Sequence, residues 1–171
     1  MKRALVIIDM LNDFIHRDGA LYINGGEEII DSIREEKERA KKNGIPIIYI
    51  CDFHRKNDPE FKIWPPHCVQ GTKGAEIIDE LKPDKDDIVV KKNTYSGFYK
   101  TDLEKILEAR KIENLILTGV ATNICVLYTA ADARMRGYAV EVLKEGVEGL
   151  TSQDKKWALT QMKKVLQVLV K

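Results

Sequence analysis

The chain has 171 residues, the length of one domain with a single hydrophobic core, and its 44% hydrophobic and 32% charged residues are ordinary globular proportions. Its 28 basic and 27 acidic side chains give a net charge of +1 without a dense basic run, which argues against nucleic acid and membrane surfaces as partners. No apolar run approaches bilayer length and no signal peptide is evident, so we expect one domain over residues 1–171, located in the cytoplasm.

Apolar runs and helical patterns alternate along the chain. The run at 3–8 predicts a strand buried on both faces, with Asp9 at its C-terminal end. The other expected elements are helix 27–42, strand 45–51, strand 88–90, helix 102–110, strand 114–118, helix 123–135, strand 138–143, helix 151–163 and an apolar run at 165–170. This alternation predicts a doubly wound α/β sheet with right-handed crossovers.

The segment 53–72 does not fit a plain α/β scaffold. It contains Pro59, Pro65 and Pro66 and shows no clear periodicity. Loops of this length inside compact domains are usually functional or disordered, and the aromatic residues Phe61 and Trp64 argue against disorder. We therefore expect a functional loop.

Polar residues follow the ends of four predicted strands. Asp9 follows the first strand, Asp52 and His54 the second, Lys92 the third, and Cys125 the fourth. In open α/β sheets, ligands bind at the carboxyl ends of the strands near the point where strand order reverses. These side chains are therefore expected to meet in one crevice.

Asp52, His54 and His67 form a candidate metal site. Asp52 and His54 are two residues apart at a strand end, which turns both side chains to the same side, and His67 can return from the long loop. Cys51 and Cys68 are weaker candidates for metal ligands. Cys51 alternates to the opposite face of the strand from Asp52, and Cys68 is adjacent to His67. The alternative interpretation is a capping aspartate with two surface histidines.

Cys125 is a candidate nucleophile because it lies where an apolar run breaks at Gly119 and a helical pattern begins. Unpaired N–H groups and the positive end of the helix dipole favour a thiolate at such a position. Asp9 could accept the thiol proton, and a cationic Lys92 between them would stabilise the thiolate. The alternatives are a small buried hydrophobic residue, a capping aspartate and a solvated lysine.

Two other classes fit part of this pattern. Aspartates after two strands and a lysine after a third also describe a phosphate-accepting receiver domain, but a receiver needs neither the cysteine nor the histidine-bearing loop. A metal-binding interaction domain without catalysis is the other alternative. The odd number of cysteines, with no C-x-x-C pair, suits a reducing compartment; no role is assigned to Cys51 or Cys68.

Several short motifs along the chain carry these polar residues. They are Val6-Ile7-Ile8-Asp9-Met10 with Asn12-Asp13-Phe14, Asp52-Phe53-His54, Trp64-Pro65-Pro66-His67-Cys68-Val69-Gln70-Gly71-Thr72, Lys92 before Tyr95-Ser96-Gly97-Phe98, and Gly119-Val120-Ala121-Thr122 before Cys125. With these motifs the sequence resembles the isochorismatase-like cysteine hydrolases, and within them the metal-containing nicotinamidases.

The resemblance implies a role for each site residue. The catalytic triad would be Asp9, Lys92 and Cys125. One divalent metal per chain, zinc with iron or manganese as alternatives, would bind Asp52, His54 and His67. The bond between Val120 and Ala121 would be cis, the N–H groups of Ala121 and Cys125 would form the oxyanion hole, and Phe14 and Trp64 would sandwich the substrate ring.

The resemblance also implies a three-layer α/β/α fold with a six-stranded parallel sheet in the order 3-2-1-4-5-6, and assembly as a homo-oligomer. The small-molecule substrate would be nicotinamide, hydrolysed to nicotinate and ammonia for pyridine-nucleotide salvage. One position departs from the pattern: nicotinamidases usually have an acidic residue where Asn123 stands. Another small amide or ureide is therefore the alternative substrate.

Overall fold

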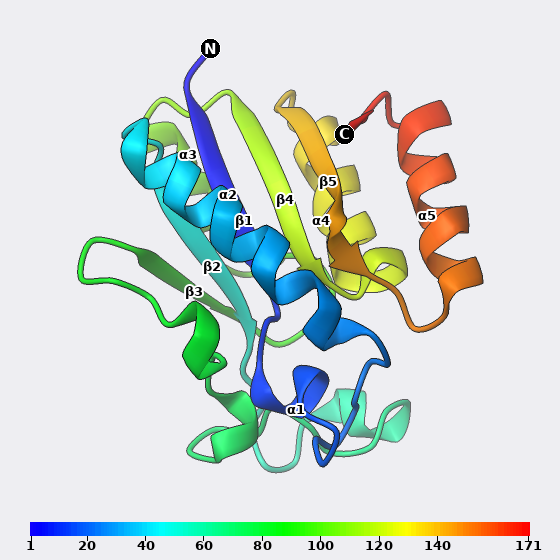
Figure 1. The fold of residues 1–171 in the computed structure, drawn as a ribbon. Helices are drawn as coiled ribbons and strands as arrows, with labels where there is room; N and C mark the ends of the chain where they lie inside the picture. Colours follow the sequence, from blue (N-terminus) through cyan, green and yellow to red (C-terminus); the bar gives the residue numbers. More distant parts are fainter.

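The computed structural model describes all 171 residues and contains one six-stranded parallel sheet in the order β3-β2-β1-β4-β5-β6 (Figure 1). The strands are β1 Arg3–Ile8, β2 Ile47–Asp52, β3 Ile88–Lys92, β4 Asn114–Val120, β5 Ala139–Glu148 and β6 Leu169–Val170. The expected number, direction and order of strands are confirmed. A receiver-like sheet of five strands is excluded.

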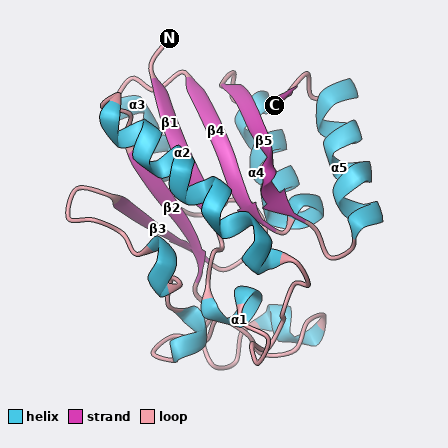
Figure 2. Ribbon diagram, viewed as in Figure 1, coloured by secondary structure: helices cyan, strands magenta, loops and turns pink.

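Helices cover both faces of the sheet, which gives the expected three layers (Figure 2). The helices are α1 Asn12–Ile15, α2 Ile30–Lys42, α3 Leu103–Ala109, α4 Leu127–Met135 and α5 Ser152–Lys164. Helix α2 packs on one face, and α3, α4 and α5 pack on the other. None of the helices is both long and apolar enough to span a bilayer.

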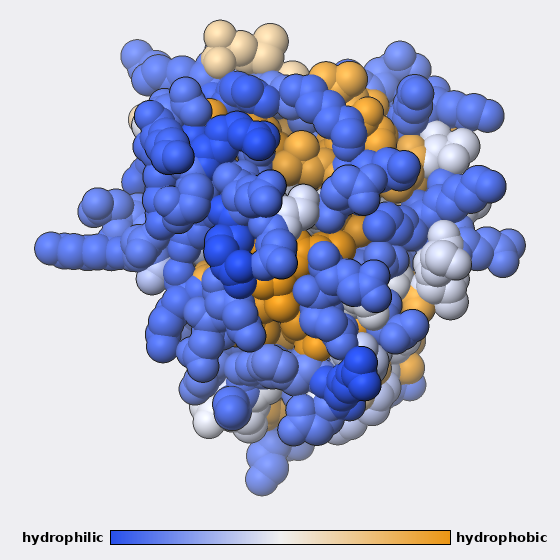
Figure 3. Space-filling model, in the orientation of Figure 1, coloured by the Kyte–Doolittle hydropathy of each residue, from blue (hydrophilic) through white to orange (hydrophobic).

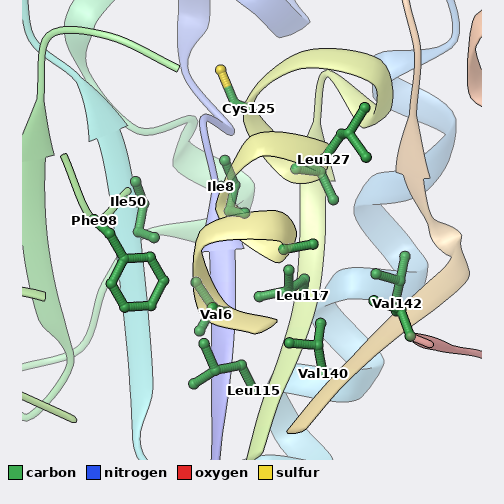
Figure 4. Close-up of a cluster of buried hydrophobic side chains, with 14 of the residues drawn as sticks. Val6, Ile8, Ile50, Phe98, Leu115, Leu117, Cys125, Leu127, Val140 and Val142 are labelled. Atoms are coloured by element: carbon green, nitrogen blue, oxygen red, sulfur yellow. The ribbon is translucent and has the colours of Figure 1, made fainter. Parts of the chain in front are cut away.

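Two hydrophobic clusters form the core because alternate residues of a strand point to opposite faces. Leu5 and Ile7 of β1 belong to the cluster under α2, whereas Val6 and Ile8 belong to the cluster under α3, α4 and α5. Figure 4 shows part of the second cluster, with Cys125 at one end of it. Hydrophilic side chains cover most of the molecular face in Figure 3.

Four elements differ from the expected ones. The helix expected at 27–42 begins as a 3-10 turn, Gly26–Ile29, before α2, and only Leu169–Val170 of the apolar run at 165–170 form a strand. The helix expected at 123–135 begins as a π-helical turn, Thr122–Val126, before α4 starts at Leu127. The strand expected at 138–143 continues to Glu148, because extra residues in β5 between Val142 and Val147 shift the register and let Val147 and Glu148 pair with Gly119 and Val120 of β4. The exposed, charged residues at 144 and 145 interrupt the apolar pattern and hide this extension in the sequence.

The loops of the site lie beyond the C-terminal ends of the strands, around α1 (Figure 1). The segment 53–72 is ordered by local structure: Asp58 caps the short 3-10 turn Pro59–Lys62 by accepting a hydrogen bond from the Glu60 N–H. It then returns beside β2, where His54 donates its N–H to the Cys68 carbonyl at 3.0 Å and Gln70 donates to the His54 carbonyl at 2.9 Å. These two bonds bring His67 back to the sheet edge.

Candidate active site

Four predicted site residues meet at the carboxyl edge of the sheet. Asp9 follows β1, Asp52 and Lys92 end the paired strands β2 and β3, and Cys125 lies in the turn after β4. All four are buried, with at most 6% of each residue exposed. The convergence expected from parallel strand ends is therefore observed.

Lys92 lies at the centre of this group. Its Nζ is 2.8 Å from Asp9 Oδ2 and 3.5 Å from Cys125 Sγ, and it donates a hydrogen bond to Asp52 Oδ1. The side chain is fully buried. Burial alone would lower the pKa of Lys92, but Asp52 and Asp9 raise it well above its usual value, so the side chain is an ammonium ion.

The pKa values of Asp9 and Cys125 suit a base and a protonated thiol. Burial, followed by the charge of Asp52, raises the pKa of Asp9 to about 6. Burial also raises the pKa of the Cys125 thiol well above its usual value, although Lys92 opposes this shift. The thiolate expected from the helix start is therefore wrong for the resting protein, because the loss of hydration outweighs the nearby positive charge.

The turn after β4 brings Cys125 to the sheet edge. Gly119 has a φ of +105°, and a Cβ on it would lie 1.9 Å from the Ile8 carbonyl oxygen, so only glycine fits beside β1. The peptide bond between Val120 and Ala121 is cis, as the resemblance implied. The Ala121 carbonyl accepts the N–H groups of Ile124 and Val126, which closes the π-helical turn that holds Cys125.

Asp52, His54 and His67 also come together. Asp52 Oδ2 is 3.7 Å from Nε2 of each histidine, and the three ligand atoms lie within 4.8 Å of one another. His67 Nδ1 is 2.8 Å from the Pro65 carbonyl oxygen, and His54 Nδ1 is 3.3 Å from Asp58 Oδ2. Each imidazole thus has an acceptor behind it and its Nε2 facing the carboxylate, the usual arrangement of histidine ligands.

This group fits a divalent metal. Both ring nitrogens of His54 are buried and without a hydrogen-bond partner within the chain, and Nε2 is the one that faces Asp52 Oδ2, where a ligand nitrogen would lie. One oxygen and two imidazole ligands suit zinc, iron and manganese and leave positions open. A second group, Asp9, Asp52 and Cys125, also lies within 4.8 Å, but the Lys92 ammonium pairs with both carboxylates there and would repel a cation.

A cavity of about 270 Å³ opens beside Cys125. Its walls are mainly aromatic and aliphatic, and they include both residues expected to hold a substrate ring, Phe14 and Trp64. The other lining residues are Ala20, Leu21, Tyr22, Ile23, Asp52, Glu60, His67, Tyr95, Ala121, Ile124, Cys125 and Leu150. Cys125 and Ala121 share this cavity with Asp52 and His67, so the candidate nucleophile and two residues of the candidate metal group face one space.

Sequence reasoning assigned no role to three residues of this site. Glu60 lines the cavity, and burial, followed by the charge of Asp52, raises the pKa of its carboxyl. Tyr95 accepts a hydrogen bond from Trp64 Nε1 at 3.1 Å and joins two walls of the cavity. Asp58 supports His54. Glu60 and Asp58 lie in the segment 53–72, which has no periodicity that would show which side chains face inward. Tyr95 lies in the motif Tyr95-Ser96-Gly97-Phe98, which carries a resemblance but no stated role for this side chain.

Asn123 does not line the cavity. Its Oδ1 accepts the backbone N–H of Leu150 at 3.2 Å, and Leu150 in turn forms part of the cavity wall. Asn123, the residue that departs from the expected pattern, therefore lies behind the cavity wall and affects the cavity only through its hydrogen bond to Leu150.

A family model described as the isochorismatase domain matches residues 3–171. Among curated relatives, the isochorismatase family protein PncA of Bacillus subtilis is 36% identical, covering 94% of this chain and 93% of its own. The nicotinamidase/pyrazinamidase of Mycobacterium tuberculosis is 31% identical, covering 94% of each chain. The ureidoacrylate amidohydrolase RutB of Acinetobacter baylyi is 33% identical, covering 77% of this chain and 64% of its own.

Solved structures agree with the observed fold. N-carbamoylsarcosine amidase from Thermoplasma acidophilum matches with a TM-score of 0.93 and 38% identity, covering 100% of this chain and 96% of its own. Pyrazinamidase of Pyrococcus horikoshii in complex with zinc matches with a TM-score of 0.93 and 34% identity, covering 100% and 99%. These relatives include enzymes named for more than one kind of amide.

Proposed function

The chain belongs to the isochorismatase family as an amide-hydrolysing member, and from this premise we propose that it is a metal-containing cysteine hydrolase that converts nicotinamide and water to nicotinate and ammonia. The observation that carries the proposal is the position of Cys125, beside Asp9 and Lys92 in the wall of an apolar cavity that Asp52 and His67 of the candidate metal group also line. The product would enter pyridine-nucleotide salvage. A cytoplasmic location and a homo-oligomeric state remain predictions.

In the proposed reaction, Cys125 Sγ attacks the amide carbonyl carbon while Asp9 takes the thiol proton. Asp9 then gives this proton to the departing nitrogen, so that ammonia leaves and a thioester with Cys125 remains. Water attacks the thioester, Asp9 accepts a proton from it, and the acid and the free thiol are formed. A carboxyl with a pKa of about 6 can accept and return a proton near neutral pH.

Lys92 and the turn after β4 would stabilise negative charge. The Lys92 ammonium keeps Asp9 available as a base and lies 3.5 Å from Sγ, where charge develops as the proton leaves. The N–H groups of Ala121 and Cys125 are proposed to bind the carbonyl oxygen as it becomes an oxyanion. Both residues line the cavity in which the amide substrate would bind.

The cavity favours a flat, uncharged amide. Phe14, Trp64 and Tyr95 offer aromatic surfaces for a ring, and no arginine or lysine lines the walls. A divalent ion on Asp52, His54 and His67 would offer an open position to a pyridine nitrogen. Ureidoacrylate and N-carbamoylsarcosine, named for two relatives, carry a carboxylate, and the cavity wall offers it Glu60 but no arginine or lysine side chain as a partner.

An ammonia-release assay tests this choice of substrate. It compares nicotinamide, pyrazinamide, benzamide and N-carbamoylsarcosine on protein loaded with zinc, with Cys125→Ala as the blank. We expect release from nicotinamide and pyrazinamide, much slower release from benzamide, which lacks the ring nitrogen, and none from the carbamoyl compound.

The outcomes separate the parts of the proposal. Benzamide hydrolysis as fast as that of nicotinamide would contradict the role of the metal in holding the ring nitrogen. Release only from the carbamoyl compound would favour the alternative, an amidohydrolase for a small ureide, which the relatives of that type also support.

A further inference from the structure

Asp13, in the motif Asn12-Asp13-Phe14, has no part in the mechanism above, yet its carboxylate joins two segments of the site. Oδ2 accepts the backbone N–H of Cys68 at 2.7 Å, directly after His67 in the chain. Oδ1 accepts the N–H of Ala20 at 3.2 Å, in the cavity wall. One side chain thus forms hydrogen bonds both to the segment 53–72, at Cys68, and to the part of the cavity wall that contains Ala20.

The Cys68 backbone needs such a partner. Its φ is +45°, a left-handed conformation that non-glycine residues seldom adopt, and the residue is fully buried. An ionised carboxylate at 2.7 Å makes a strong hydrogen bond to this N–H. Without that bond, the peptide would be free to relax toward extended backbone, and this would turn the neighbouring His67.

A close-fitting space holds the Asp13 carboxylate in place. Gly74 lies directly against it: a Cβ at Gly74 would be 2.2 Å from Asp13 Oδ2 and 2.4 Å from Oδ1. Asn12 fixes the turn that carries Gly74, because its Nδ2 donates to the carbonyls of Lys73 at 2.8 Å and Glu76 at 3.1 Å. Neither the glycine nor this turn has another evident function.

We propose that Asp13 is a positioning residue for the metal site: by fixing the backbone at Cys68, its carboxylate keeps the His67 imidazole directed at Asp52 and His54. The proposal rests on the ligand set of the proposed function. It does not depend on the identity of the amide substrate.

Cobalt titration of chelator-treated protein tests the proposal, because the visible absorption of bound Co²⁺ reports ligand geometry as well as affinity. In Asp13→Asn one carboxylate oxygen is replaced by an NH₂ group, which is a donor, so the side chain can no longer accept the N–H groups of Cys68 and Ala20 on separate oxygens. Gly74→Ala displaces the same carboxylate without changing a charge. We expect each variant to bind Co²⁺ about 10- to 100-fold more weakly, with an altered spectrum, as for the loss of outer-sphere partners of metal ligands.

Glu141→Gln is the matched control. Glu141 is also a buried carboxylate with several partners, Asn114, Arg3 and Lys171, but it lies at the opposite end of the sheet. This variant should bind Co²⁺ as the wild type does, even if its melting temperature falls as far as those of the other two.

Wild-type affinity and spectrum in Asp13→Asn and Gly74→Ala, with only a lower melting temperature, would show a merely structural role and overturn the inference. If Asp13→Asn does not fold, Gly74→Ala alone decides. Absence of Co²⁺ binding in the wild type would overturn both the ligand set and this inference. Failure to hydrolyse nicotinamide, with Co²⁺ binding intact, would contradict only the proposed substrate.

Discussion

Replacing Lys92 with methionine should destabilise the protein strongly, because the change removes an ammonium that forms ion pairs with two buried carboxylates. Asp9 and Asp52 are only 1% and 3% exposed, and no other cation lies within ion-pair distance of Asp9. Breaking a buried ion pair by removing one partner costs about 3–5 kcal/mol. At about 2–4 °C per kcal/mol for a chain of this size, the melting temperature should fall by roughly 6–20 °C.

Urea unfolding of chelator-treated protein at pH 7 measures this loss. Lys91→Met is the matched control, because Lys91 is the preceding residue on β3, is exposed, and has its Nζ 3.7 Å from the ring centre of Phe53. Loss of this exposed cation–π contact should cost about 0.5–1 kcal/mol. The double variant Asp9→Asn/Lys92→Met should recover part of the loss, since it leaves one buried carboxylate fewer.

Equal unfolding free energies for the two lysine variants would refute the reasoning, because Lys92 would then not be compensating buried charge. No recovery in the double variant would show that the cost comes from packing of the lysine stem. Ammonia release should be lost in Lys92→Met whatever its stability, if the ammonium keeps Asp9 ionised.

Three further substitutions test single residues. Cys125→Ala should abolish ammonia release yet change the unfolding free energy by only about 1 kcal/mol, the value of one buried CH₂-sized group; wild-type turnover would refute the nucleophile. His54→Ala/His67→Ala should lose the bound ion in elemental analysis, and unchanged metal content would refute the ligand set; histidines are substituted because Asp52 also pairs with Lys92. Asn123→Asp should keep nicotinamide turnover within a few-fold, since a carboxylate can still accept the Leu150 N–H; a large loss would indicate direct contact with the substrate.

The central strands were predictable because they are buried on both faces. The runs 4–8 and 115–117 contain only apolar residues, as is typical of strands inside a parallel sheet. The extension of β5 was not predictable, since it depends on a shift in the pairing register between β4 and β5. The π-helical turn before α4 likewise depends on tertiary contacts that the helical pattern does not reveal.

The meeting of Asp9, Asp52, Lys92 and Cys125 followed from topology alone, because each residue ends a strand or lies in the segment directly after one. Glu60 and Asp58 could not be placed, because their segment has no period that fixes which side chains face inward. The prediction that Cys125 rests as a thiolate was wrong for a related reason. It depends on the degree of burial, which a one-dimensional pattern does not give.

Trp64, which is hydrogen-bonded to Tyr95 in the cavity wall, is an intrinsic fluorescent reporter of the cavity. The chain has two tryptophans; the other, Trp157, is 56% exposed on α5. In a Trp157→Phe background, all indole emission would come from a side chain in the cavity wall, so occupancy changes its fluorescence directly. Combined with Cys125→Ala, this variant allows equilibrium affinities of candidate amides to be measured without turnover, label or coupled enzyme.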